Sequence, residues 1–463
     1  MSNGSHAPLP HAAAPSWYRW ELLALLFCSF FFHQCDRAIF SVALPAIQKD
    51  LSLDSSAVGM VGSALFLTLA LLMPVAGYIG DIFNKKWIIT ASVIFWSSAT
   101  ALTGLAQGVW GLIAFRSVAT AGGESFYAPA AYPLLAAYRK TTRGLAMSVH
   151  QASLYIGVIS SGFLGGYIAL HYGWRSMFWL FGLSGVMLGA VFAFRLRSAP
   201  PETHHNAKVG PIEALGVLLR TPTALLLTVG FTAIVLVNNA YVMWAPAFVG
   251  EKFGLDLLQA GVSAMLYHHL AALVGVLLGG PLSDALVLRM PRFRLVFQSI
   301  AMPCGAPAIL LLGQGQTLAA TETAMAVFGL CRGLYESNTH ASLFDVIPSR
   351  YRASAVGVMV MLGFLAGSTS PWLLGKLRDH MDVPVAAQAE VSAAAPASDS
   401  TAAVSPAATP RGRGLSLGFS LLSIAYLVGA LAVAVAAFTT FYRDRVLEPV
   451  PEPSLPAPAA QRG

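Results

Sequence analysis

Six charged residues lie inside long apolar stretches of the sequence, where ionised side chains are rare. They fall into three groups, each with an acid and a base: Asp36, Arg37, Arg116, Glu124, Arg332 and Glu336. A charge at the centre of a bilayer costs at least about 2.5 kcal/mol, so such residues mark functional sites by default. The alternative interpretation is that static ion pairs hold helices together. It is strongest for Arg332 and Glu336, whose i, i+4 spacing lets them pair along one helix face.

Asp36 and Arg37 are adjacent in the sequence, so on a helix they point about 100° apart and cannot both face one partner. We expect Arg37 to bind a substrate carboxylate, because its planar guanidinium can donate two parallel hydrogen bonds to an anion. His33 lies one turn earlier on the same face, and Gln34 adds a polar group. Both are predicted substrate-binding residues. Asp36 is predicted to carry a proton or to position the arginine.

Glu124 follows Gly122 and Gly123, which allow another helix to approach closely and leave room around the carboxyl. Burial favours the neutral form of a carboxyl, and a cation that comes and goes favours the charged form. A group with these two states can take up a proton on one side and release it on the other. Glu124 is therefore the predicted coupling residue. Arg116 lies eight residues earlier, about 12 Å along a helix axis, and is predicted to belong to a structural or coupling charge network.

Several other polar side chains within apolar stretches are candidates for lining a cavity. The predicted substrate-binding residues among them are Tyr127, Tyr155, Tyr241 and Asn338. Aromatic residues also serve as packing and interface anchors, and an asparagine can equally join two helices. Arg332 and Glu336 are predicted to form a structural or coupling charge network. The four cysteines have no metal-binding or disulfide spacing, and neither a metal nor a cofactor is predicted.

The most specific string in the sequence is GYIGDIFNKK, at 77–86, with a weaker copy at 280–289. An acid at a helix end, followed by a basic turn, can lock the ends of two helices together. Its charges would pair in one conformation and part in another. The predicted conformational switch comprises Gly77, Asp81, Lys85, Lys86 and Asp284.

The composition indicates that membrane-spanning helices position these residues. Hydrophobic residues make up 56% of the 463 residues and charged residues 11%, whereas soluble domains carry about 25% charged residues. A spanning helix needs about 20 apolar residues. Twelve runs meet this length, at 20–44, 57–80, 87–106, 108–135, 144–170, 174–195, 221–248, 257–285, 294–314, 318–346, 353–376 and 416–441.

The basic residues behind the net charge of +7 lie mostly in short loops, which argues against nucleic-acid binding. They concentrate in the connections after even-numbered runs, which predicts that these loops and both termini are cytoplasmic. The predicted all-α organisation is an N-terminal tail (1–19), a six-helix bundle (20–195), a cytoplasmic linker (196–220), a second bundle (221–441) with a flexible outer loop (381–414), and a C-terminal tail (442–463).

The chain resembles the major facilitator superfamily. Residues 77–86 look like its loop 2–3 signature, and DRAIFSVALP at 36–45 resembles the Asp-Arg motif of the anion:cation symporter family, which includes proton-coupled sugar-acid transporters. The stretch 116–122, with Glu124 and Pro129, resembles the helix-four motif of that family. The resemblance implies a fold of twelve helices in two pseudo-symmetric bundles. It also implies that Arg37 binds the carboxylate, with Asp36 and Glu124 as protonation sites.

The loop signature departs from the family pattern at Ile82 and Asn84, where Arg and Gly are usual. Asn84, with Gly-Glu-Ser at 123–125 and Phe-Trp-Ser at 95–97, is similar to the Spinster-like branch, whose substrates include lysolipids and sphingolipids. Transport or export of an amphiphile is therefore the alternative function.

We expect a secondary transporter of the bacterial inner membrane that takes up a small organic anion, a sugar acid or other carboxylate, with protons by alternating access. Its expected partners are the anion, protons and the bilayer, and we expect a monomer. The sequence lacks a GxxxxGK[ST] loop, which disfavours an ATP-driven pump. It also lacks the clustered nucleophile and base of an enzyme, and a receptor would need a signalling domain.

Overall fold

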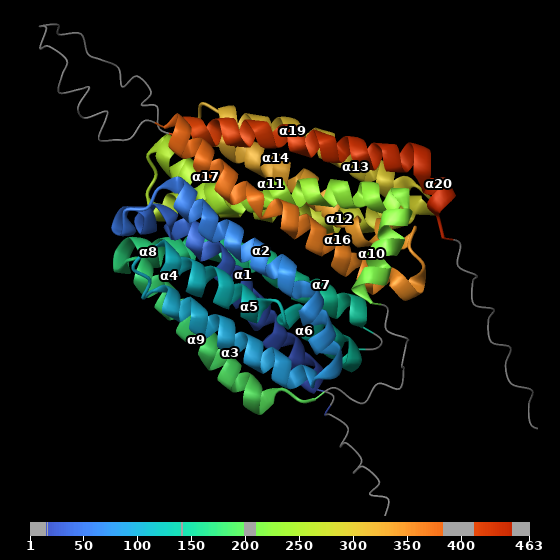
Figure 1. Cartoon of the computed structure of the whole chain (residues 1–463), viewed down its shortest axis with the longest axis horizontal. Coiled ribbons are helices and arrows are strands. Elements are labelled where there is room, and N and C mark those ends of the chain that lie inside the picture. Colours follow the sequence, from blue (N-terminus) through green and yellow to red (C-terminus); the bar gives the residue numbers. More distant parts are fainter. Residues whose placement is uncertain (1–14, 16, 140–141, 199–209, 383–411, 447–463) are drawn as a thin grey trace, which may run out of the picture.

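The computed structural model describes residues 15, 17–139, 142–198, 210–382 and 412–446, and within these residues every regular element is helical. Two groups of helices lie side by side along the long axis of the molecule (Figure 1). The first half comprises α1 (Tyr18–Leu51), α2 (Ser55–Ile82), α3 (Lys85–Thr103), α4 (Val109–Leu112), η1 (Ile113–Ala119), α5 (Thr120–Glu124), α6 (Tyr127–Tyr138), α7 (Arg143–Ser160), η2 (Ser161–Gly165), α8 (Gly166–Tyr172) and α9 (Trp174–Arg195).

The second half follows the linker and packs beside the first half. Its elements are α10 (Pro211–Arg220), α11 (Pro222–Phe253), α12 (Leu257–Val287), α13 (Phe293–Gln314), α14 (Leu318–Glu336), α15 (Thr339–Phe344), η3 (Ser349–Tyr351), α16 (Arg352–Gly367), α17 (Thr369–Met381), α19 (Arg413–Val435), η4 (Ala436–Thr440) and α20 (Phe441–Asp444). We call the end with the turns at 83–84 and 196–198 the linker end. The end with the turns at 52–54 and 254–256 is the distal end.

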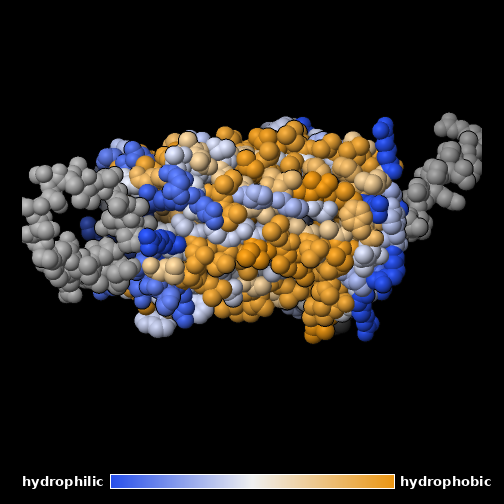
Figure 2. Space-filling view, turned by 90° about the horizontal axis from the view of Figure 1, so that it is seen from above, coloured by the Kyte–Doolittle hydropathy of each residue, from blue (hydrophilic) through white to orange (hydrophobic). Residues whose placement is uncertain are grey.

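On the face seen in Figure 2, the surface is mostly apolar in the middle of the molecule and hydrophilic towards both ends, as a bilayer requires. In the described residues, nine helical segments are long and apolar enough to cross a membrane. The remaining predicted crossings correspond to α3 and to two interrupted helices. One of these is the run at 108–135, which contains the π-helical segment η1 and a break at 125–126 after Glu124. The other is the run at 318–346, which is interrupted at 337–338.

Two predicted segment boundaries differ from the structure by a few residues. The first helix already begins at Tyr18, and the last ends at Asp444, because polar and aromatic residues at the bilayer edge continue the helices beyond their apolar cores. The linker contains α10, which buries Ala214 and Leu218 and packs on α16. The predicted loop at 381–414 falls largely outside the described residues, as do most residues of both tails.

Near the distal end, the backbones of the two halves come into direct contact. A Cβ atom on Gly59 of α2 would lie 2.5 Å from the carbonyl oxygen of Pro371 in α17. A Cβ on Gly162 of η2 would lie 2.5 Å from the carbonyl oxygen of Gly261 in α12. Larger side chains at these glycines would hold the halves apart, so the small residues permit a closed distal end.

Candidate functional site

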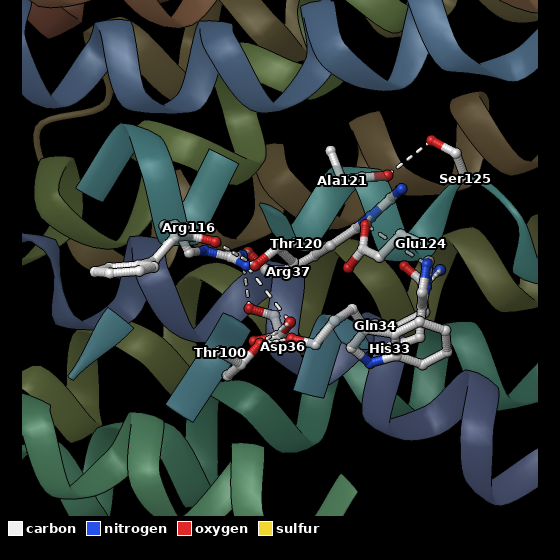
Figure 3. Close-up of polar contacts among 12 residues, drawn as sticks. His33, Gln34, Asp36, Arg37, Thr100, Arg116, Thr120, Ala121, Glu124 and Ser125 are labelled. Carbon is white, nitrogen blue, oxygen red and sulfur yellow. Dashed lines mark hydrogen bonds and ion pairs between the residues drawn. The ribbon is translucent and has the colours of Figure 1, made fainter. Parts of the chain in front are cut away.

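Arg37 and Glu124 form the ion pair at the centre of the first half (Figure 3). The Nε atom of Arg37, on α1, donates to Oε2 of Glu124, at the end of α5, over 2.8 Å. The Glu124 side chain is fully buried, whereas that of Arg37 remains 23% exposed. The second carboxylate oxygen of Glu124 has no hydrogen-bond partner among the described residues. In this pair, the buried Glu124 carboxylate contacts the Arg37 guanidinium, which a ligand can reach.

Asp36 and Arg116 form a second pair, which is almost fully buried. Nη1 of Arg116 lies 3.5 Å from Oδ2 of Asp36, and its Nη2 donates to the carbonyl oxygens of Asp36 and Arg37 at 2.8 and 3.1 Å. Thr100 donates its hydroxyl to Oδ2 of Asp36 over 2.7 Å. Arg116 is only 2% exposed. It joins η1 to α1 at the point where Arg37 projects, and its structural or coupling role stays a prediction.

Replacing Arg116 with alanine should destabilise the protein by about 3–5 kcal/mol, because the variant leaves Asp36 buried without its cation. The double variant Arg116→Ala/Asp36→Asn should recover part of that loss. Chemical denaturation of the purified protein measures both effects. A single variant as stable as the wild-type protein would contradict the structural role.

His33 approaches the same carboxylate oxygen of Glu124 as Arg37 does, and Gln34 lies next to His33. Nε2 of His33 is 3.6 Å from Oε2 of Glu124, and its Nδ1 is 3.0 Å from the amide nitrogen of Gln34. His33 also stacks on Phe30, with ring centroids 5.5 Å apart, and is 5% exposed. His33 thus lies next to the carboxylate, and both predicted residues are buried.

A small pocket lies between the two halves, next to Arg37. Its polar contributors are Arg37, Arg116 and Ser41. The other lining residues are Phe40, Val61, Gly62, Leu65, Phe66, Val242 and Met243. Val242 and Met243 come from α11 of the second half, so both halves contribute walls. Sequence reasoning did not identify this apolar lining, because such residues look the same wherever a helix packs.

The predicted tyrosines differ in their surroundings. The hydroxyls of Tyr127 and Tyr241 donate to the carbonyl oxygens of Leu26 and Ala264, at 3.0 and 2.6 Å, and both side chains are 1% exposed. They pack within their own halves, and their role in binding stays a prediction. Tyr155 instead reaches across the halves, with its hydroxyl 3.4 Å from Oε2 of Glu336.

The second half carries its own charge cluster, on α12 and α14, in which Arg332 is buried and Glu336 is partly exposed. Nη2 of Arg332 lies 3.4 Å from Glu336, which fits the predicted i, i+4 pairing. Nη1 of Arg332 lies 3.2 Å from Nε2 of His268, a contact that the sequence did not predict. Asn338 is 1% exposed and donates to the Ser337 hydroxyl, so it lies in the helix break and not in the pocket by Arg37.

The contacts of the predicted switch are clearest in its second copy, at 280–289. Asp284 accepts from Nη2 of Arg294 over 2.8 Å, and Nη1 of Arg294 lies 3.2 Å from Asp345. This network joins the linker ends of α12 and α13 to the residue after α15. In the first copy, Gly77 faces open space and the Lys86 ammonium lies 4.8 Å from the Trp87 ring centre. The side chain of Asp81 is outside the described part of the chain, and Lys85 is the first residue of α3.

Two helical halves with an apolar belt and a charged pocket between them define a membrane transporter. The sequence profile of the Major Facilitator Superfamily matches residues 26–371, and the chain belongs to this superfamily. The predicted fold, twelve spanning helices in two bundles, is thereby confirmed, and the protein is a transporter and not an enzyme.

The relatives include transporters of small anions and a Spinster protein. A probable sulfoacetate transporter of Cupriavidus necator is 25% identical over 381 residues, which cover 78% of this chain and 87% of the relative. The hexuronate transporter of Bacillus subtilis is 23% identical, covering 78% and 88%. The protein spinster of Drosophila melanogaster is 24% identical, covering 78% of this chain and 62% of the relative.

The fold is also shared with a solved structure. A bacterial homolog of the human lysosomal transporter Spinster, in an inward-facing and unoccupied conformation, superposes with a TM-score of 0.80. The match covers 94% of this chain and all of that one, at 20% sequence identity. At this identity the likeness concerns the fold alone.

Proposed function

We propose that this transporter takes up a small organic anion together with protons by alternating access. The observation that carries the proposal is the Arg37–Glu124 pair, in which an accessible cation neutralises a fully buried carboxylate. The names of the relatives support an anion, since they include sulfoacetate and hexuronate transporters. Arg37 also lines the pocket between the halves, where alternating access would expose it to each side in turn.

The pair links anion binding to protonation. An anion that takes the guanidinium of Arg37 removes the cation that lies 2.8 Å from Glu124. A buried carboxylate without a cation is costly to keep charged, so Glu124 takes up a proton when the anion binds. Release of the anion returns Arg37 to Glu124 and expels the proton. By linkage, the two ligands favour each other's binding, and they cross the membrane together.

His33 and Asp36 have supporting roles in this proposal. His33, at 3.6 Å from Glu124, lies where a proton would enter or leave the carboxylate. Asp36 is the second protonation candidate, since its Oδ1 has no hydrogen-bond partner in the described residues. The contact with Arg116 compensates its charge, so its main role here is to hold Arg116 in place.

We also propose that the linker end faces the cytoplasm of a bacterial cell, with both termini on that side. The basis is the concentration of lysine and arginine in the connections at this end. Labelling of single cysteines with an impermeant maleimide in intact cells tests this orientation. Modification at 83–84 without permeabilisation would contradict it.

A second candidate substrate is an amphiphilic anion. Six of the pocket residues carry apolar aliphatic, aromatic or thioether side chains: Phe40, Val61, Leu65, Phe66, Val242 and Met243. Sugar hydroxyls facing such groups would lose hydrogen bonds with water and gain none, at a cost to affinity. The likeness to Drosophila spinster and to the Spinster homolog fold is compatible with this candidate.

A matched pair of six-carbon carboxylates separates the two candidates. Gluconate carries five hydroxyls, and hexanoate carries none. A ligand at 100 times its Kd stabilises a protein by about 2.7 kcal/mol, so the anion that binds should raise the Tm of the purified transporter. We expect stabilisation by gluconate for the sugar-acid proposal and by hexanoate, together with a lysophospholipid, for the amphiphile. In either case Arg37→Ala should abolish the shift. A shift that persists in this variant would contradict the proposed site.

A further inference from the structure

The end of α17 contacts the start of α2, although these helices belong to different halves. Oδ1 of Asp379 accepts a hydrogen bond from the backbone N–H of Ser55 over 2.9 Å. Its Oδ2 accepts from the backbone N–H and the hydroxyl of Ser56, at 2.6 and 2.7 Å. The first N–H groups of a helix have no partner within that helix. Asp379 therefore caps a helix of the opposite half.

This contact differs from the other caps at the distal end, which stay within one half. Asp54 accepts from the N–H of Ala57 on its own helix, α2, over 2.7 Å. Asp256 accepts from the N–H of Gln259 on its own helix, α12, over 2.7 Å. These two caps can persist in any arrangement of the halves. The cap by Asp379 exists only while the distal ends touch.

The surroundings of Asp379 are built for close contact between the halves. A Cβ atom on Gly375, one turn earlier on α17, would lie 2.3 Å from the carbonyl oxygen of Ser55. Nη1 of Arg378 donates to Oε1 of Gln48, on α1, over 3.1 Å. Arg378 and Asp379, two successive residues of α17, thus form hydrogen bonds with the first half at a point where the backbones of the two halves are in contact.

We propose that Asp379 is a positioning residue of the transport cycle, which stabilises the conformation with a closed distal end by capping α2 across the two halves. When the distal ends separate, the N–H groups of Ser55 and Ser56 lose the carboxylate and turn to water. Loss of a cap of this kind shifts a two-state equilibrium by about tenfold. The inference rests on alternating access, but neither on the identity of the anion nor on protons.

Double electron–electron resonance on the purified full-length protein tests this without any substrate. Spin labels at Lys49→Cys and Gln316→Cys, exposed positions at the distal ends of different halves, report the opening, in a background with the exposed Cys28 and Cys304 changed to serine. The wild-type distribution should be dominated by the short distance. Asp379→Ala should raise the ratio of long-distance to short-distance populations about tenfold. Asp379→Glu, which keeps the carboxylate, should restore most of the short-distance population.

Matched control variants distinguish loss of the cap between the two halves from a general loss of stability at the distal end. Asp256→Ala removes a cap of similar geometry that stays within one half, so it should leave the distance distribution unchanged. Gly375→Ala should open the distal end by steric clash, whereas Gly357→Ala, whose Cβ would meet nothing within 4 Å, should not. An unchanged distribution in Asp379→Ala, or an equal shift in Asp256→Ala, would overturn the proposal. If the alanine variant does not fold, Asp379→Asn, which keeps only one of the two acceptor oxygens, should shift the distribution in the same direction by less than tenfold, and an unchanged distribution in that variant would overturn the proposal.

Discussion

Replacing Arg37 with alanine is expected to lower anion uptake about 100-fold or more, while the protein still inserts into the membrane. Hydrogen bonds to charged groups contribute about 1.5–3 kcal/mol each, and 1.4 kcal/mol corresponds to a factor of ten. A guanidinium that donates two such bonds to a carboxylate therefore accounts for at least this loss. Uptake of radiolabelled gluconate into proteoliposomes, at equal amounts of inserted protein, measures the effect.

Two further variants distinguish lost binding from lost folding. Arg37→Ala also leaves Glu124 buried without its partner at 2.8 Å, so the single variant is expected to lose stability as well. The double variant Arg37→Ala/Glu124→Gln should regain stability without regaining uptake. Arg37→Lys keeps the charge but not the planar fork, and should retain an intermediate rate. Uptake at the wild-type rate in Arg37→Ala would exclude this residue as the carboxylate ligand.

Replacing Glu124 with glutamine is expected to abolish accumulation driven by a pH gradient while preserving exchange of anion across the membrane. With one proton per monovalent anion, a gradient of one pH unit can drive roughly tenfold accumulation. The variant cannot bind the proton, so its accumulation ratio should fall to about one. Glutamine is close in size to glutamate and leaves the fully buried site filled. Counterflow with preloaded anion measures exchange separately from accumulation.

Glu322→Gln is a suitable control for that experiment. Glu322 accepts from the hydroxyl of Ser263, a contact between two helices of the second half that lies away from Arg37. This variant should accumulate the anion as the wild-type protein does. Gradient-driven accumulation that survives in Glu124→Gln would assign the coupling proton to another residue, with Asp36 the first alternative.

Much of the architecture could be predicted from the sequence, because apolar length and loop charge are properties of single segments. The lengths of the twelve apolar runs predict the spanning helices. The rotation of about 100° per helical residue predicts that Asp36 and Arg37 face different partners. The close contact of Arg332 with Glu336 also follows, since both lie on one helix.

The pairing between helices could not be predicted in the same way. Arg116 meets Asp36, and Glu124 meets Arg37, only because α1 packs against a helix interrupted by the π-helical segment η1. A π-helical turn changes the angle around the helix axis between Arg116 and Glu124. The number of residues between them does not predict that change. The cap by Asp379 was missed for a similar reason, since an acid at a helix end resembles any solvated charge until its partner is known.

Proton movement during anion uptake tests the central claim most directly. Proteoliposomes that enclose a pH-sensitive dye are given an inward gluconate gradient without a pH gradient, and luminal pH is followed beside radiolabelled uptake. We expect wild-type protein to acidify the lumen in proportion to the gluconate that enters. Glu124→Gln should exchange gluconate without any change of pH. Gluconate entry that leaves the luminal pH of wild-type vesicles constant would contradict the coupling of anion and proton through Arg37 and Glu124.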